Sequence, residues 1–225
     1  MISHNHKFIF IHIPKCGGSS VIQNEYRWHR PISKYKGNHD RPHEPLEFYK
    51  KTFPKEFKEY FKFSIVRNPW AKVVSLFFFR KMRSSFWLDG QPTASPHWPS
   101  AELIAKTSFR DTVLNSLNQN PEFSEIVPPR DSNETAWLEP ACFPWVTLDG
   151  KIGLDFICKL ETIQQDYNKV CDKIGIPCQK FPHTNRTNHK HYTKHYTEYY
   201  DDETQKIVAE RYAKDIEHFG YEFGD

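Results

Sequence analysis

Residues 7–20 read KFIFIHIPKCGGSS and contain the signals for a strand followed by a tight turn. β-Branched and aromatic residues at positions 8–13 are typical of a short strand that is buried on both faces. Pro14 ends this strand because proline has no backbone donor. Gly17 and Gly18 then allow a tight turn with accessible backbone N–H groups. The pattern therefore predicts a buried strand that ends in a glycine turn.

The turn leads into a helix whose start is suited to hold an anion. We expect Ser19 or Ser20 to cap a helix that continues through residues 21–27. A strand, a glycine turn and a helix start together direct backbone N–H groups at an anion, and Lys15 adds a positive charge. The order differs from a Walker loop, GxxxxGK[ST], because this lysine precedes the glycines. The alternative is a plain strand–turn–helix junction with an exposed lysine.

Residues 67–75, RNPWAKVVS, repeat this arrangement after a second predicted strand at residues 61–66. Arg67 follows that strand directly, at the end where ligands bind in open α/β sheets. Apolar spacing predicts a helix over residues 70–82, with Ser75 in its second turn. Arg67 and Ser75 are then placed to grip one phosphate together. The alternative is that Arg67 pairs with a carboxylate and Ser75 is an ordinary helix residue.

Strands alternate with helices along the rest of the chain, so we expect an α/β fold with three layers: a mainly parallel central sheet flanked by helices. The further predicted strand is residues 152–158, after a turn at residues 149–150. The further predicted helices are residues 46–60 (broken at Pro54), 101–117, 161–174 with Gly175 as C-cap, and 201–219 with a capping box of Asp202 and Gln205. Loops are predicted at residues 31–45, 84–99, 121–144 and 183–200.

Composition limits the classes of function. The 225 residues fit one α/β domain, and 16% aromatic residues compensate in part for a hydrophobic content of 38%. A formal net charge of +3 is too small to argue for nucleic acid as a partner. No early apolar stretch suits a signal peptide or a membrane span, so we expect a soluble, cytoplasmic chain; a lumenal protein trimmed of its anchor is the alternative. The five scattered cysteines, without a CxxC pair, indicate neither a disulfide scaffold nor a zinc site.

IPKCGGSS and VRNPWAKVVS resemble the two nucleotide-binding motifs of the sulfotransferases. The resemblance is to the carbohydrate group that includes heparan 2-O-sulfotransferases and many bacterial relatives. The segments KLE at residues 159–161 and FPHTN at residues 181–185, with the last predicted helix, also resemble this family. The similarity implies a P-loop-like fold and a single sulfotransferase domain over residues 1–225. It is weakest over residues 84–146, where we expect an acceptor-side insertion.

The resemblance also implies the co-substrate and the residues that bind it. The family uses 3′-phosphoadenosine 5′-phosphosulfate (PAPS), and transfers its sulfuryl group to an acceptor hydroxyl, here that of a glycan. The 5′-phosphosulfate is expected on Lys15, Cys16, Gly17, Gly18, Ser19 and Ser20, and the 3′-phosphate on Arg67 and Ser75. The family often has threonine where Cys16 stands, which leaves the backbone role intact. A histidine between the motifs serves as base, and His39 is the best positional match.

In-line transfer of a sulfuryl group is expected to depend on positioning and charge stabilisation. Lys15 meets the charge that grows on the leaving phosphate, and a neutral His39 takes the proton of the acceptor. His43, four residues further on, is the alternative base. Because no acidic cluster suggests Mg²⁺, we predict no metal. Arg186, in the histidine-rich loop, is expected to cover the nucleotide or to contact an anionic acceptor; a solvated loop is the alternative.

Two other classes of protein compete with the sulfotransferase. A P-loop kinase-like phosphotransferase predicts Mg²⁺ dependence and an acidic metal ligand, and the position of Lys15 before the glycines argues against it. A non-catalytic nucleotide-binding module predicts tight binding without turnover, and His39 argues against it. Neither the identity of the acceptor nor the oligomeric state follows from the sequence.

Overall fold

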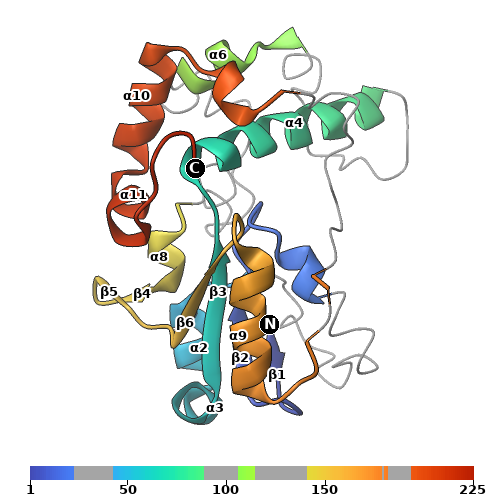
Figure 1. Ribbon diagram of the computed structural model, residues 1–225, viewed down its shortest axis with the longest axis vertical. Helices are drawn as coiled ribbons and strands as arrows, with labels where there is room; N and C mark the ends of the chain where they lie inside the picture. The colour runs from blue at the N-terminus through green and yellow to red at the C-terminus, as the bar shows by residue number, and fades with distance from the viewer. Residues whose placement is uncertain (23–42, 89–105, 115–140, 179, 182–193) are drawn as a thin grey trace. The chain divides into compact units, whose positions relative to one another are not determined.

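The computed structural model describes residues 1–22, 43–88, 106–114, 141–178, 180–181 and 194–225 (Figure 1), with residues 83–88 described by their backbone alone. The chain divides into two compact units. The first contains Met1–Asn68 and Ala141–Arg186, and the second contains Pro69–Pro140 and Thr187–Asp225.

In its described part, the first unit is built on a four-stranded sheet with strand order β1-β2-β3-β6. The strands are β1 (Ile2–Ser3), β2 (Phe8–Ile11), β3 (Phe61–Val66) and β6 (Phe156–Lys159). β1 pairs antiparallel with β2, whereas β2, β3 and β6 run parallel. The carboxyl ends of these three strands therefore meet at one edge of the sheet. This confirms the prediction for the loop with Gly17 and Gly18, which follows β2, and for the loop with Arg67, which follows β3.

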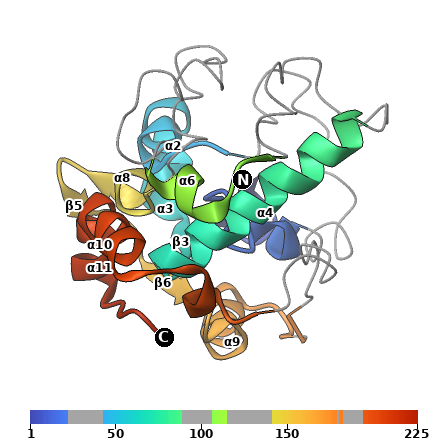
Figure 2. The ribbon, with the colours of Figure 1, turned by 90° about the horizontal axis from the view of Figure 1, so that it is seen from above.

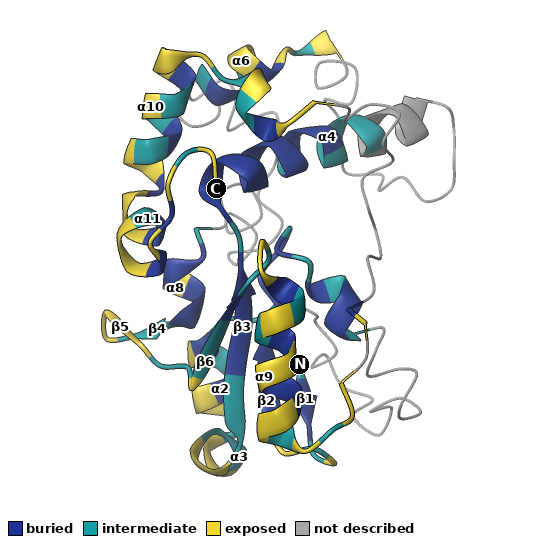
Figure 3. Cartoon of the chain, in the orientation of Figure 1, coloured by how far each residue is buried: buried dark blue, intermediate teal, exposed yellow. Residues whose placement is uncertain are grey.

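β2 is the most buried strand of this sheet (Figure 3), and each of its four residues is at most 1% exposed. The ring of Phe63 on β3 packs against two rings of β2. Its centroid lies 5.0 Å from that of Phe10 and 5.5 Å from that of Phe8. Burial on both faces confirms the prediction from the continuous apolar run. The strand ends at Ile11, two residues earlier than predicted.

Helices lie on both faces of this sheet (Figures 1 and 2), with α9 over one face and α2 over the other. The helices of this unit include α2 (Leu46–Thr52), α3 (Pro54–Glu59), α8 (Phe143–Val146) and α9 (Ile163–Ile174). α9 packs against β6 and β3. The break at Pro54 is confirmed. Gly175 ends α9 in the left-handed conformation with φ of 70°, also as predicted.

The predicted strand at residues 152–158 is two separate strands. β4 (Thr147–Leu148) and β5 (Lys151–Ile152) form a hairpin around the predicted turn, and β6 begins only at Phe156. Gly153 lies between them against α2, where an added Cβ would come within 2.7 Å of Leu46 Cδ2. The predicted loop at residues 121–144 is likewise wrong at its end, because α8 begins at Phe143. Pro144 is tolerated there in the first helical turn.

The second unit is helical in its described part. Its elements are α4 (Pro69–Leu88), α6 (Phe109–Thr112), the 3₁₀ helix η3 (Tyr196–Tyr199), α10 (Asp202–Arg211) and α11 (Ala213–Phe219). α4 contacts α6, η3 and α10. α4 confirms the predicted helix and extends it by six residues, so the loop predicted from Ser84 is wrong up to Leu88. Residues 84–88 contain no glycine or proline that would stop the helix.

The helix predicted over residues 101–117 is interrupted within its described part. Ser108 is the N-cap of α6, with its Oγ accepting from Asp111 N at 3.0 Å, so a new helix begins there. The long helix predicted over residues 201–219 is also divided, because Tyr212 leaves helical geometry with φ of −106° and ψ of 24°. The predicted loops at residues 31–45 and 183–200 lie largely outside the described residues; η3 occupies part of the second.

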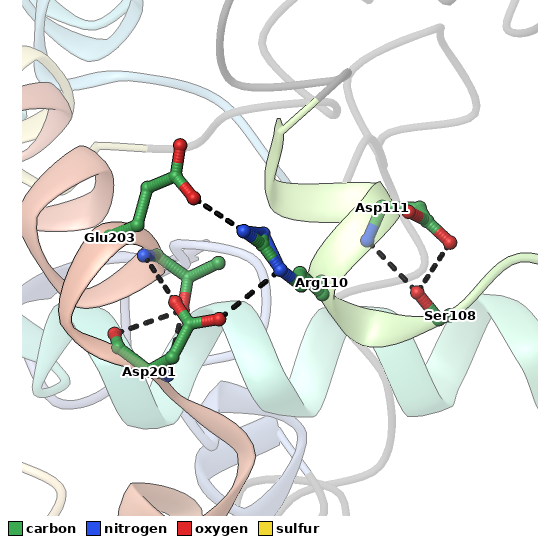
Figure 4. Close-up of polar contacts among 6 residues, drawn as sticks. Ser108, Arg110, Asp111, Asp201 and Glu203 are labelled. Atoms are coloured by element: carbon green, nitrogen blue, oxygen red, sulfur yellow. Dashed lines mark hydrogen bonds and ion pairs between the residues drawn. The ribbon is translucent and has the colours of Figure 1, made fainter.

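The cap of α10 is shifted by one residue from the prediction (Figure 4). Asp201 Oδ1 accepts from Thr204 N at 2.8 Å, and Asp201 N donates to Thr204 Oγ1 at 3.0 Å, so these residues form the capping box in place of Asp202 and Gln205. Arg110 of α6 ties the two helices together. Its guanidinium contacts Glu203 and lies 3.3 Å from Asp201 Oδ2. Across the described ranges, no helix combines the length and the apolar character needed to cross a membrane.

Candidate functional site

The loop that follows β2 carries the first predicted anion motif. Residues 14–17 form a turn, and residues 18–22 are helical. Ser20 N donates to Gly17 O at 3.1 Å within the first turn. Ser19 and Ser20 therefore lie inside the helix, and their predicted role as N-cap is wrong. The helix N-terminus still adjoins the loop, where its dipole favours a negative charge.

Two glycines of this loop are required for different reasons. Gly17 has a φ of 78°, and an added Cβ would come within 2.7 Å of Leu160 Cδ1. At Gly18 an added Cβ would lie 2.1 Å from Cδ2 of His12, whose ring packs against the loop. Lys15 also has a positive φ, 64°, which is uncommon for a residue with a Cβ and is found more often at functional sites. The loop is thus held in one shape by backbone conformation and by close packing.

Lys15 has an unusual ionisation. Burial, with a further contribution from the nearby guanidinium of Arg67, lowers the pKa of its ammonium to about 8. A negative charge on the Cys16 sulfur raises the pKa of Lys15 and so opposes these two effects in part. A buried ammonium beside another cation is stabilised by a bound anion, because the anion supplies the missing opposite charge. The electrostatics of this loop therefore favour an anionic ligand.

Arg67 brings the second predicted motif to the first. Its Nη1 donates to the carbonyl oxygen of Lys15 at 3.2 Å, so the residue after β3 is bonded to the loop after β2. The ends of the parallel strands are tied together at the same edge. Leu160 N donates to Val66 O at 2.9 Å, and Asn68 N donates to Glu161 Oε1 at 2.8 Å. Two cationic side chains thus converge at the carboxyl edge of the sheet.

His43 lies beside His12, near the same loop. The two ring centroids are 4.2 Å apart, and His43 Nδ1 is 2.9 Å from the carbonyl oxygen of His12. Because a carbonyl oxygen accepts only, His43 Nδ1 must carry the hydrogen, which leaves Nε2 as the basic nitrogen of the neutral ring. Burial lowers the pKa of His43, and the bond to His12 opposes this in part. His43 is therefore neutral at physiological pH and has the tautomer of a base.

The other predicted site residues are not brought to this loop by the described structure. Ser75 is a buried residue of α4 in the second unit, so its pairing with Arg67 stays a prediction. His39 and Arg186 lie outside the described residues. No group of three or more histidine, cysteine or acidic side chains that suits a metal ion is found within the described ranges.

Two neighbours of the loop were not predicted from the sequence. His12 was interpreted only as a continuation of the strand, although it packs beneath Gly18. Cys142 Sγ lies 3.7 Å from Cys16 Sγ, although the two residues are 126 positions apart. A local pattern cannot indicate either contact, because both depend on side chains that only the tertiary fold brings together.

The mainly parallel sheet has a glycine turn and two cations at its carboxyl edge. These features are those of an α/β protein with a loop suited to bind an anion. A family model described as "Sulfotransferase family" matches residues 1–222. The chain therefore belongs to the sulfotransferase family, which confirms the resemblance of the two motifs and supports sulfotransfer as its activity. No curated protein and no solved structure matches the chain.

Proposed function

We propose that this enzyme transfers the sulfuryl group of PAPS to the hydroxyl of a carbohydrate acceptor. The observation that carries the proposal is the bond between Arg67 and the carbonyl of Lys15, which joins two separately predicted anion motifs at one edge of the sheet. The lowered pKa of Lys15 adds support, because the loop is short of negative charge. We further propose that the fold is P-loop-like with three layers, and that residues 84–146 of a single domain form the acceptor-side insertion.

We assign the donor to both motifs. The 5′-phosphosulfate would lie on the loop, held by backbone N–H groups and the charge of Lys15. The proposed loop residues are Lys15, Cys16, Gly17, Gly18, Ser19 and Ser20. Arg67 and Ser75 would hold the 3′-phosphate, with Arg186 over the nucleotide. Not every nitrogen of Arg67 is available to the phosphate, since Nη1 already donates to the carbonyl oxygen of Lys15. A guanidinium has five N–H donors, so this bond leaves others for a phosphate.

The transfer would proceed in line, with the acceptor oxygen and the leaving phosphate oxygen on opposite sides of the sulfur. The S–O bond to the leaving phosphate breaks as the bond to the acceptor forms, and the hydroxyl proton passes to the base. Lys15 and the loop N–H groups stabilise the charge that grows on the leaving phosphate. We propose no metal in this step, because these cations supply the positive charge.

We assign the base to His39 from the family resemblance, with His43 as the second candidate. The neutral ring of His43, with Nδ1 bonded to His12 and Nε2 basic, supports the alternative. Single alanine variants at the two positions separate the candidates. The base variant should lose about 10²–10⁴-fold in turnover and still bind adenosine 3′,5′-bisphosphate, because the base faces the acceptor. Equal turnover in both variants and the unchanged enzyme would exclude both histidines.

The proposed activity is tested with labelled PAPS and a panel of glycans, phenols and small alcohols. We expect label on a glycan, in the presence of EDTA as well as in its absence. Lys15→Ala should abolish transfer, and Lys51→Ala is the matched control, since Lys51 is exposed on α2 and forms an ion pair with Glu47. Label transfer from ATP that requires Mg²⁺ would favour the kinase alternative. Tight binding of the bisphosphate without any transfer would favour the non-catalytic module.

A further inference from the structure

Cys16 of the loop and Cys142 form a thiol pair in the core of the first unit. Their Sγ atoms are 3.7 Å apart, and the residues are 1% and 0% exposed. The sulfurs of a disulfide are about 2.0 Å apart, so a bond requires these two to approach each other by about 1.7 Å, through side-chain rotation and a shift of the segment that carries one of them. Neither cysteine is part of a disulfide in the structure. The pair is therefore close enough to be cross-linked without a rearrangement of the sheet.

The two partners lie in different kinds of segment. Cys142 is the N-cap of α8, and three of the four residues of that helix are buried. Cys16 lies in the loop, between two residues with positive φ, Lys15 and Gly17. Because the loop depends on these backbone angles for its shape, a bond that pulls Cys16 toward Cys142 would displace the loop from that shape. The displaced segment contains the backbone N–H groups that face a bound anion.

Cys16 is the thiol of the pair that is suited to react first. The ammonium of Lys15 and a Cys16 thiolate attract each other, and it is the thiolate that attacks an oxidant. Lys15 and Gly17 are half-exposed, so a small oxidant approaches along the loop.

We propose that Cys16 and Cys142 form a reversible disulfide with a hydroperoxide as oxidant, and that the oxidised loop no longer binds the nucleotide. The Cys16 thiolate attacks the peroxide oxygen, which breaks the O–O bond and gives a sulfenic acid and an alcohol, or water from hydrogen peroxide. The Cys142 thiol then displaces water from the sulfenic acid, so the cysteines lose two electrons and the peroxide gains them. The second half of the proposal rests on the proposed function.

Peptide mapping tests the bond itself. Trypsin places each of the five cysteines on its own peptide: residues 16–27, 131–151, 152–159, 170–173 and 174–180. After treatment of the reduced protein with hydrogen peroxide and alkylation of the remaining thiols, we expect a linked species of peptides 16–27 and 131–151 that dithiothreitol separates. Bound adenosine 3′,5′-bisphosphate should slow its formation, because the ligand holds the loop. Separate alkylation of both peptides, or linkage of another pair, would overturn the proposal.

Binding tests the consequence. Oxidation should weaken binding of adenosine 3′,5′-bisphosphate at least tenfold, and dithiothreitol should restore it. Cys142→Ser should bind the bisphosphate when reduced and should resist peroxide, whereas the control Cys178→Ser, at an exposed site, should stay sensitive. Should Cys142→Ser fail to fold, peptide mapping of the unchanged protein decides. A linked peptide with unchanged binding of the bisphosphate would refute the regulation. A reduced protein that does not bind the bisphosphate would instead refute the proposed function. Peptide mapping would still decide whether the disulfide forms.

Discussion

Raising the pH should weaken the binding of adenosine 3′,5′-bisphosphate, because Lys15 loses its proton in a range where ordinary lysines keep it. The pKa of Lys15 in the empty loop is about 8. A bound phosphate favours the ammonium and raises this pKa, so binding above the pKa requires uptake of a proton. The phosphates of the ligand have their second pKa near 6, so the charge of the ligand stays nearly constant above about pH 7.

The size of the effect follows from the position of that pKa. If Lys15 is fully protonated in the complex, the dissociation constant rises about tenfold per pH unit above the pKa. Between about pH 7 and about pH 9.5 this gives about 30-fold, or roughly 2 kcal/mol. Below about pH 7 the contribution of Lys15 to binding is constant, since the lysine is then charged in both states.

Isothermal titration calorimetry measures both quantities. The dissociation constant should rise over this range, and titrations in two buffers of different ionisation enthalpy should show uptake of nearly one proton at about pH 9.5. Lys15→Arg is the matched control, because a guanidinium stays charged and should flatten the profile. Cys16→Ser should keep the slope, which separates Lys15 from the neighbouring thiol. A dissociation constant that changes less than about threefold, without proton uptake, would refute the assignment of Lys15.

Gly18→Ala should destabilise the protein by about 1–3 kcal/mol and abolish bisphosphate binding, since the added Cβ meets the ring of His12; melting curves and titration measure this. Gly175→Ala is its control, because that site has a positive φ and open space; it should cost about 1 kcal/mol and leave binding intact. Asp201→Ala should lower the melting temperature at neutral pH. The hydrogen bonds from Thr204 lower the pKa of Asp201, so the advantage of the unchanged protein should disappear as the pH falls through that lowered pKa; an equal deficit in strong acid would contradict this. His39→Ala should cut turnover about 10²–10⁴-fold with bisphosphate binding retained, and loss in His43→Ala instead would move the base to His43.

The strands and their edge followed from the sequence because β2 and β3 are buried on both faces. Such burial leaves a continuous apolar run, and parallel strands bring the loops that follow them to one edge. The convergence of Lys15 and Arg67 was predictable for that reason. Helix ends were predicted less well. The helix predicted over residues 201–219 is divided at Tyr212 by a change in backbone angles, and no glycine or proline in the sequence indicates this change.

The neighbours of the loop were beyond prediction, since they are tertiary contacts. The ring of His12 fills the space that Gly18 leaves, and Cys142 approaches Cys16 from a distant part of the chain. The tautomer of His43 likewise depends on a carbonyl that only the folded loop presents. Sequence patterns identify which residues have suitable chemistry, whereas the fold decides which of them meet.

The parallel sheet also determines when the chain can fold during synthesis. β2 is complete at Ile11, but β3 begins at Phe61 and β6 only at Phe156, so 144 residues lie between the end of β2 and the start of β6. At about 5–20 residues per second, ribosomes need roughly 7–30 s to make that length. During this time the apolar run FIFI has no complete sheet to join, and unpaired apolar strands aggregate. From this early position of β2 we expect slow folding and a dependence on chaperones during expression.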